Sequence, residues 1–303
     1  MKRTEQKMNR TEKYAGIFPS LYACYDSFGK IDPAAQRRLS RHLLESGANG
    51  IYVCGSAGEC MLLTAGERML ILECALAECG GSIPVIAHVA CPTTEESRRL
   101  AAHAASAGAD AVAALPPFFY KVSDRENAEY WKAISAAAPG VDFFIYDIPE
   151  LSANRLTDAL LREMAQCEDL AGVKASSETA GDVERFGEIL GDNRCVMCGS
   201  DGLLCAELAL GACGGIGGTY AALIEHFSEL YRSFSSGDVR AATEHQRLIW
   251  HFLETAEKRQ CSIYALMKEI IRIKYGIDAG SVRPPLAPVT DADRALAAVL
   301  AKM

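Results

Sequence analysis

Eight short apolar runs, each four to six residues long, are spaced along the first 220 residues of this chain. Most of them are followed by a longer stretch in which apolar residues recur with the period of an α-helix. Parallel strands need crossover connections of this length, so the alternation predicts strand–helix units in a parallel sheet. Runs that are apolar on both faces are typical of strands covered by helices. The predicted strands are residues 17–21, 50–54, 84–88, 111–115, 142–146, 171–174, 194–199 and 214–218, and the predicted helices between them are residues 33–45, 65–77, 94–107, 124–138, 157–166 and 202–210.

Eight such units favour a closed (β/α)8 barrel over an open, doubly wound sheet, which is the alternative that the same alternation allows. No Pro-, Gly- or Ser-rich linker interrupts the units, so residues 1–220 are predicted to form one barrel. After Thr219 the pattern is purely helical through Tyr275, then comes a Pro-rich joint at 283–288 and an amphipathic stretch from Asp291. We therefore expect residues 221–303 to form a C-terminal helical extension packed on the barrel.

The charge balance and hydropathy exclude several kinds of partner. The chain carries 39 Asp and Glu against 31 Lys and Arg, a net charge of −8, whereas nucleic acids and anionic membranes bind to concentrated positive charge. No run reaches the roughly 18 apolar residues of a membrane span, and the basic start is not followed by the apolar core of a signal peptide. We expect a cytoplasmic protein without nucleic-acid or membrane partners.

The twelve cysteines pose the question of disulfides or metal binding. Most lie within apolar runs, where a free thiol behaves as a small apolar side chain. Cys195-Val-Met-Cys198 has the CxxC spacing, yet the chain holds no second CxxC and no nearby histidine pair, and residues three apart in a strand point to opposite faces. Packing is therefore favoured over redox or zinc chemistry.

Two polar residues end neighbouring predicted strands, where barrel enzymes hold their catalytic groups. Lys174 ends one apolar run, and burial of its stem would lower the pKa of the amine, as a nucleophile requires. Tyr146 ends the preceding run, and because adjacent strands lie about 4.8 Å apart, both side chains are able to reach one carbonyl compound. A phenol beside an amine transfers protons. Each residue alone also fits a salt-bridged lysine or a packed tyrosine at the rim.

Two further segments contain several glycines, one at the end of the second predicted strand and one after the seventh strand–helix unit. In Cys54-Gly-Ser-Ala-Gly-Glu59 the small residues allow backbone N–H groups to approach an anion, and Ser56 adds a hydroxyl. The segment Gly214-Gly-Ile-Gly-Gly218 is compatible with a phosphate site and equally with a wide barrel mouth.

Together these segments resemble the pyruvate-dependent class I aldolases, the family that includes N-acetylneuraminate lyase and dihydrodipicolinate synthase. The resemblance extends from about Gly16 to the C-terminus. It rests on short motifs that occur in the family's order, namely Gly55-Ser-Ala-Gly-Glu59, Pro117-Phe-Phe-Tyr120, Tyr146-Asp-Ile-Pro149, Gly172-Val-Lys174 and Gly214-Gly-Ile-Gly-Gly-Thr-Tyr220.

The resemblance implies a Schiff-base mechanism that needs neither a metal nor an organic cofactor. Lys174 would form an imine with the keto carbon of pyruvate or another 2-oxo acid, and Tyr146 would relay protons with Ser56 in hydrogen-bonding reach. The N–H groups of Ser56 and Ala57 would hold the substrate carboxylate. The resemblance also implies a homotetramer with Tyr120 near a subunit contact, and a sugar site formed by Ser176, Thr179, Gly199, Asp201 and Gly218.

Several details resemble the sialic acid lyase branch. The similarity to that branch lies in two places, at residues 87–91 with Thr94 and Glu96, and at residues 149–152. The synthase branch usually carries an arginine two residues after the proline of the YxxP motif, where this chain has Leu151.

Three positions depart from the family pattern. Ala57 stands where threonine is usual, Phe119 where tyrosine is common, and Gly202 where sialic acid lyases have a glutamate that binds the polyol tail of the sugar. The tail is therefore shorter, or another residue supplies this contact.

We expect an enzyme that cleaves an N-acetylneuraminate-like 2-oxo sugar acid to pyruvate and an aldehyde sugar. The alternatives are a condensation of pyruvate with aspartate semialdehyde, another 2-oxo acid aldolase or dehydratase, and a non-catalytic 2-oxo acid sensor. A metal-dependent aldolase is a further alternative. The six histidines show neither HxH nor HExxH spacing, and His88, the one at a strand end, is expected to be a packed or hydrogen-bonded rim residue.

Overall fold

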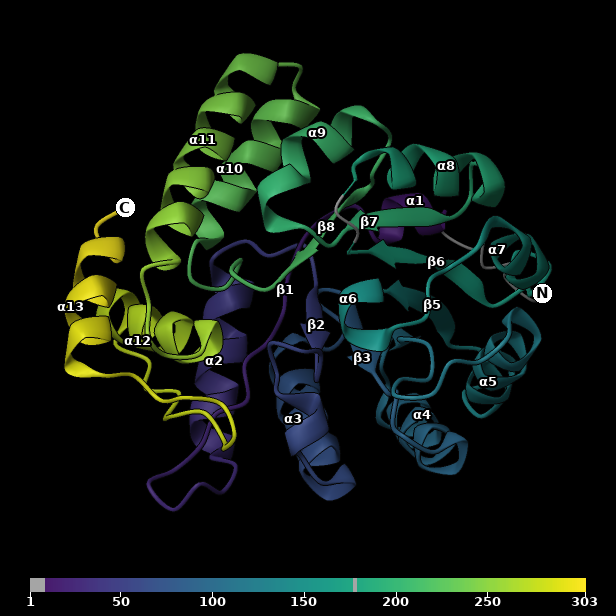
Figure 1. The fold of residues 1–303 in the computed structure, drawn as a ribbon, viewed down its shortest axis with the longest axis horizontal. Helices are drawn as coiled ribbons and strands as arrows, with labels where there is room; N and C mark the ends of the chain where they lie inside the picture. Colours follow the sequence, from purple (N-terminus) through teal and green to yellow (C-terminus); the bar gives the residue numbers. More distant parts are fainter. Residues whose placement is uncertain (1–8, 177–178) are drawn as a thin grey trace, which may run out of the picture.

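The computed structural model describes residues 9–176 and 179–303, and its centre is a barrel of eight parallel strands (Figure 1). Neighbouring strands pair in the order β1-β8-β7-β6-β5-β4-β3-β2. The ring closes between β1 and β2, where the Leu21 N–H donates to the Tyr52 carbonyl at 2.9 Å. The predicted barrel is confirmed, and the open sheet is excluded because β1 pairs with β8. The strands are β1 (Gly16–Pro19), β2 (Ile51–Val53), β3 (Val85–His88), β4 (Ala111–Ala114), β5 (Asp142–Asp147), β6 (Leu170–Ala175), β7 (Cys195–Cys198) and β8 (Gly214–Gly217).

Helices surround this barrel, and their ends follow from local sequence signals. Asp32 caps α2 and Pro33 occupies its first turn, whereas Thr64 and Glu67 form a reciprocal capping box at the start of α3. The helices up to β8 are α1 (Arg10–Lys13), α2 (Pro33–Glu45), α3 (Ala65–Cys79), α4 (Thr94–Ala107), α5 (Asp124–Ala136), α6 (Pro149–Ser152), α7 (Asp158–Met164), α8 (Gly181–Leu190) and α9 (Leu204–Ala209), with the short 3-10 turns η1 (Cys60–Leu62) and η2 (Asp201–Leu203).

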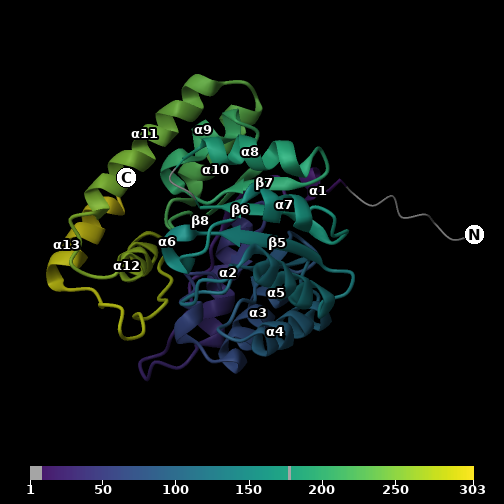
Figure 2. The same cartoon turned by 45° about the vertical axis from the view of Figure 1, so that its right-hand side comes forward.

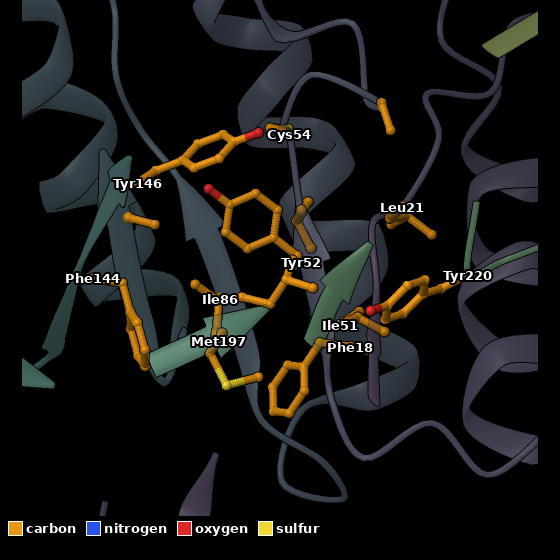
Figure 3. Packing of buried hydrophobic residues seen from close by; sticks show 14 of the residues in the cluster. Phe18, Leu21, Ile51, Tyr52, Cys54, Ile86, Phe144, Tyr146, Met197 and Tyr220 are labelled. Carbon is orange, nitrogen blue, oxygen red and sulfur yellow. The ribbon is translucent and has the colours of Figure 1, made fainter. Parts of the chain in front are cut away.

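Large side chains fill the barrel interior, so it is a packed core (Figure 3). Phe18, Tyr52, Phe144 and Met197 come from four different strands and are fully buried. Glycine makes room for them where a side chain has no space. A Cβ atom added at Gly50 would lie 2.0 Å from the ring of Phe18. The packed interior leaves space for a ligand only at the ends of the strands.

The N-terminal ends of β5 and β6 are covered by α1. Arg10 forms an ion pair with Asp142 at 2.8 Å and donates to the carbonyl of Leu170 at 3.2 Å. Tyr14, directly after the helix, donates its hydroxyl to Asp142 at 2.8 Å. Ligand access is therefore to be sought at the opposite, C-terminal ends of the strands.

The helices after β8 gather along one side of the barrel (Figure 2). Among them, α10 contacts β1 and α9, α11 packs on α10, and α12 packs on α13. A division of the chain at residue 220 stays a prediction. These helices are α10 (Ile224–Ser235), α11 (Val239–Ala256), α12 (Ile263–Tyr275) and α13 (Asp291–Leu300).

All twelve cysteines are free thiols, and nine of them are buried. Cys195 and Cys198 both lie in β7 and are fully buried, which agrees with the predicted packing role. Within residues 9–176 and 179–303, no three His, Cys, Asp or Glu side chains are grouped so that they could hold a metal ion. No helix in the same part of the chain combines the length and apolar character that crossing a membrane requires.

Candidate active site

A cavity of about 330 Å³ opens at the C-terminal ends of the strands. This volume lies within the range of small-molecule sites. The lining residues come from the strand ends, from the loops that follow them and from α12 in the C-terminal extension. They are Ser20, Ser56, Tyr146, Ile148, Glu150, Lys174, Ser176, Gly199, Ser200, Asp201, Leu203, Gly218, Thr219, Ile263 and Tyr264.

Lys174 and Tyr146 stand directly opposite each other in the register of β5 and β6. The ammonium nitrogen of Lys174 lies 4.0 Å from the centroid of the Tyr146 ring and 4.6 Å from that of Tyr52. Only 4% of Lys174 is exposed, and no carboxylate forms an ion pair with it in the described part of the chain. The structure thus brings together the amine and the phenol that the sequence singled out.

Tyr52 and His88 complete the aromatic surroundings of Tyr146, and no sequence signal marked Tyr52 as a functional residue. The Tyr52 and Tyr146 rings meet edge to face with centroids 6.0 Å apart (Figure 3), and the His88 ring meets Tyr146 at 5.9 Å. Nδ1 of His88 is 3.0 Å from the Cys54 carbonyl and donates to it. Burial, and then the positive charge of Arg68, hold the pKa of His88 well below its ordinary value. His88 is packed and hydrogen bonded, as predicted, and its burial favours the neutral form.

The loop of residues 54–59 presents donors beside the cavity. The N–H groups of Gly58 and Glu59 donate to carbonyls within the loop, whereas those of Ser56 and Ala57 donate to no acceptor among the described residues. Burial raises the pKa of Tyr264, and the side chain of Ser56, on the same cavity wall, opposes this rise. Ala57 is 1% exposed, and its side chain does not line the cavity. Ala57 is therefore able to contribute to ligand binding only through its backbone N–H.

Asp201 lies after β7, and its hydrogen bonds connect this loop to the loop that follows β8. Its carboxylate accepts hydrogen bonds from the Thr219 N–H at 2.8 Å, the Thr219 hydroxyl at 2.6 Å and the Gly218 N–H at 3.2 Å. Burial raises the pKa of Asp201, and the hydrogen bonds from Thr219 and the charge of Lys174 oppose this rise. Asp201 lines the cavity as predicted, but most of its hydrogen-bonding capacity is used within the protein.

Gly199 and Ser176 lie against each other at the cavity wall. A Cβ atom at Gly199 would lie 2.0 Å from the Ser176 hydroxyl oxygen, so glycine is required there. Within residues 9–176 and 179–303 that hydroxyl is buried and has no hydrogen-bond partner. A buried hydroxyl without a partner needs an explanation, and a bound ligand that draws it toward the cavity would supply one. By contrast, Thr179 does not line the cavity, and its hydroxyl is 3.2 Å from a carboxylate oxygen of Asp182.

Tyr120 and Phe119 point away from the cavity of this chain. Their side chains are 71% and 86% exposed, and their rings pack edge to face at 5.0 Å. Phe119 has a φ of 73°, in the left-handed region that bulky residues rarely adopt. The predicted position of Tyr120 near a subunit contact stays a prediction.

The structure adds lining residues that sequence reasoning missed. Tyr264 and Ile263 come from the first turn of α12, which no barrel pattern connects to the strand ends. Glu150 lies in α6, directly after the YxxP motif, and its carboxylate has no partner among the described residues. The proximity of Glu150 to that motif was the one available signal. The site therefore combines a buried amine, a phenol, two unused N–H groups and a polar wall.

Residues 13–303 match the dihydrodipicolinate synthetase family. An N-acetylneuraminate lyase of Mediterraneibacter gnavus is 37% identical over 303 residues, covering 100% of this chain and 96% of the relative. An Escherichia coli enzyme of the same name is 31% identical over 282 residues, covering 91% of this chain and 92% of the relative.

Solved structures show the same relationship. The wild-type sialic acid aldolase of Ruminococcus gnavus superimposes with a TM-score of 0.94 at 36% identity, with 96% of each chain covered. A dihydrodipicolinate synthase of Bacillus anthracis, at 24% identity and a TM-score of 0.89 over 95% of this chain and 98% of the other, shares the fold. The resemblance predicted from the motifs is confirmed, and the chain belongs to the dihydrodipicolinate synthetase family.

Proposed function

We propose that this protein is a class I aldolase that cleaves an N-acetylneuraminate-like 2-oxo sugar acid to pyruvate and an aldehyde sugar. The observation that carries the proposal is the pairing of buried Lys174 with Tyr146 across β5 and β6 in the wall of the cavity. The full-length similarity to proteins named N-acetylneuraminate lyase supports this substrate class.

The proposed reaction begins at the amine. The neutral amine of Lys174 adds to the keto carbon C2, and loss of water leaves a protonated imine. The C3–C4 bond then breaks, its electron pair moves toward the imine to give an enamine, and the C4 hydroxyl gives up its proton as the aldehyde forms. Tyr146 is placed beside the amine to accept that proton and to return one to C3. Water hydrolyses the resulting pyruvate imine and frees Lys174. Because the imine itself accepts the electron pair, the proposed reaction requires no metal and no organic cofactor.

The substrate carboxylate is proposed to bind at the 54–59 loop. The unused N–H groups of Ser56 and Ala57 point to an anion there, and the Ser56 hydroxyl adjoins the cavity. Since these donors belong to the backbone, the replacement of a usual threonine by Ala57 leaves them in place.

The sugar tail is proposed to meet Glu150 and Ser176. At Gly202 the indole N–H of Trp250 donates to the backbone carbonyl at 2.5 Å, and a Cβ atom would lie 3.4 Å from that nitrogen. No side chain is available there to bind hydroxyl groups. The unpartnered carboxylate of Glu150 and the buried hydroxyl of Ser176 supply acceptors for hydroxyl groups elsewhere on the cavity wall.

We further propose a cytoplasmic homotetramer. Three exposed large side chains, Phe119, Tyr120 and Leu151, support an assembly, because aromatic side chains are enriched in subunit interfaces. The free state of all twelve thiols supports a reducing compartment.

Borohydride trapping tests the proposal. With wild-type protein and N-acetylneuraminate, we expect pyruvate release and, after reduction, a mass increase on the peptide that contains Lys174. Lys174→Met should abolish both, whereas Lys121→Met, a change in the exposed loop near Tyr120, should preserve both. Labelling by pyruvate without any turnover would instead indicate a 2-oxo acid sensor. Turnover only with pyruvate plus aspartate semialdehyde would indicate the condensing activity.

A further inference from the structure

The 54–59 loop is held in an unfavourable backbone conformation at both ends. Cys54 and Glu59 each have a φ of 57°, in the left-handed region that residues other than glycine rarely adopt. Inside the loop, the Gly58 N–H donates to the Gly55 carbonyl and the Glu59 N–H to the Ser56 carbonyl, both at 3.0 Å. Such a conformation persists only where the surrounding structure fixes it. The contacts of Glu59 show what fixes this loop.

Both oxygens of the Glu59 carboxylate accept hydrogen bonds from the C-terminal extension. One oxygen accepts from the Lys268 ammonium at 2.6 Å, and the other accepts from the Arg283 backbone N–H at 2.8 Å. The side chains of Glu59 and Lys268 are 0% and 2% exposed. The two donors are 209 and 224 residues further along the chain. The loop after β2 is therefore fixed to α12 and to the segment that follows it.

Burying this ion pair costs desolvation free energy, so a gain in fold stability does not explain why the pair is present. Burial lowers the pKa of Lys268, and the charge of Glu59 opposes this shift. A buried ion pair stabilises a fold no better than a well-packed apolar pair of similar size, because desolvation offsets the attraction between the charges. What the pair provides is a fixed geometry. Lys268 also donates to the Ser281 carbonyl at 2.8 Å and lies 4.5 Å from the centroid of the Tyr25 ring, so its position is well determined.

The same helix contacts the loop at a second point. Tyr264 is four residues before Lys268, so both side chains lie on one face of α12. Tyr264 and Ser56 line the same cavity, and the Ser56 side chain interacts with the Tyr264 hydroxyl closely enough to lower its pKa against the rise caused by burial. One helix face thus contacts Ser56 within the loop and Glu59 at its end, on both sides of Ala57.

We propose that Glu59 and Lys268 are positioning residues whose buried pair ties α12 to the 54–59 loop and so fixes the N–H groups that receive the substrate carboxylate. The inference rests on the proposed function, because it takes the loop to be the carboxylate site. The pair touches neither Lys174 nor Tyr146 in any contact of the described residues. Its loss should therefore weaken the binding of 2-oxo acids and leave imine formation in the bound complex intact.

The test uses the full-length double variant Glu59→Gln/Lys268→Met, which removes both charges and leaves no buried charge unpaired. The rate of borohydride trapping is measured against pyruvate concentration by intact mass. We expect the half-saturating pyruvate concentration to rise about tenfold, equivalent to about 1.4 kcal/mol, with the limiting trapping rate within about twofold of wild type. Tm and circular dichroism establish that the variant is folded. If the double variant does not fold, Glu59→Asp gives the same measurement, because it keeps both buried charges and only shortens the reach of the carboxylate toward Lys268 and Arg283.

The matched control is Glu225→Gln/Lys274→Met. It applies the same substitutions to a pair that joins α12 to α10 at 3.1 Å, away from the loop. The control should keep the wild-type half-saturation. An unchanged half-saturation in the Glu59/Lys268 variant would overturn the inference, and so would a lower limiting rate without a change in half-saturation. A wild-type protein that pyruvate fails to label would refute the proposed function itself, and with it the premise of this inference.

Discussion

Glu207 gives the sharpest prediction for stability. It lies in α9 and is fully buried. Among the described residues, no N–H or O–H group donates a hydrogen bond to either of its carboxylate oxygens. The thiol of Cys198, a weak donor, adjoins it. Burial raises the pKa of Glu207 from 4.5 to about 7, and the negative charge of Asp182 adds to this rise. The carboxyl group is therefore neutral in the folded protein over a pH range in which it ionises in the unfolded chain.

The sign and the size of the effect on stability follow from the difference between the pKa values of Glu207 in the folded and unfolded chain. A raised acid pKa means that the folded state binds the proton more tightly, so the contribution to stability is complete below pH 4.5 and is lost as the pH rises through about 7. A difference of about 2.5 pKa units corresponds to about 3 kcal/mol. Glu207→Gln is neutral at every pH. It should match wild type near pH 4.5 and exceed its free energy of unfolding by up to about 3 kcal/mol at pH 8.5, or about 6 °C in Tm.

Thermal unfolding of both proteins between pH 4.5 and pH 8.5 measures the effect. Glu188→Gln is the matched control, because Glu188 is an exposed residue on the neighbouring helix α8 and its replacement should leave the curve unchanged. The reasoning is refuted if the difference in Tm between wild type and Glu207→Gln is the same at every pH.

Three further predictions concern the active site. Tyr146→Phe should lower kcat for sugar acid cleavage at least about 100-fold while borohydride still traps pyruvate on Lys174; loss of trapping together with kcat would contradict the proton-relay role. Glu150→Gln should raise KM for N-acetylneuraminate about tenfold, and an equal rise in half-saturating pyruvate in the trapping assay would show that Glu150 does not act on the sugar tail. Gly199→Ala should displace the Ser176 hydroxyl, which lies 2.0 Å from the new Cβ position, and steady-state kinetics should show a raised KM; an unchanged KM would show that Ser176 is not a substrate contact.

The barrel and its two central residues could be predicted because their signals are local. Apolar runs identify strands, and a polar residue that ends such a run must lie at the barrel rim, which places Lys174 and Tyr146. The short helix α6 was missed because four residues carry too little periodicity. The loop motifs then identified the family, because several of them occur in this chain in the same order as in the family.

The remaining site residues depend on contacts between distant parts of the sequence. Tyr52 lies in the middle of a predicted apolar strand, where nothing distinguishes a tyrosine facing Lys174 from one packed in the core. Tyr264 belongs to a helix 90 residues beyond Lys174, and amphipathic periodicity does not say which barrel loop that helix will contact. The sequence predicted that Asp201 lies at the site. It did not predict that the Asp201 carboxylate accepts hydrogen bonds from Thr219 and Gly218, because only the fold brings these residues close to it.

The distribution of charge at the cavity explains how a chain of net charge −8 is able to bind an acid. Among the lining residues that the structure describes, Lys174 is the cationic side chain, and two acids, Glu150 and Asp201, line the same cavity. Asp201 already receives three hydrogen bonds and burial disfavours its charge, so it repels a carboxylate less than a free aspartate would. Glu150 is exposed, where solvent screens its charge. The buried part of the site therefore favours an anion beside Lys174 and the 54–59 loop, while the acidic group at the mouth favours a neutral, hydroxyl-bearing tail. This polarity predicts one orientation for a 2-oxo sugar acid, with its carboxylate inward and its polyol outward.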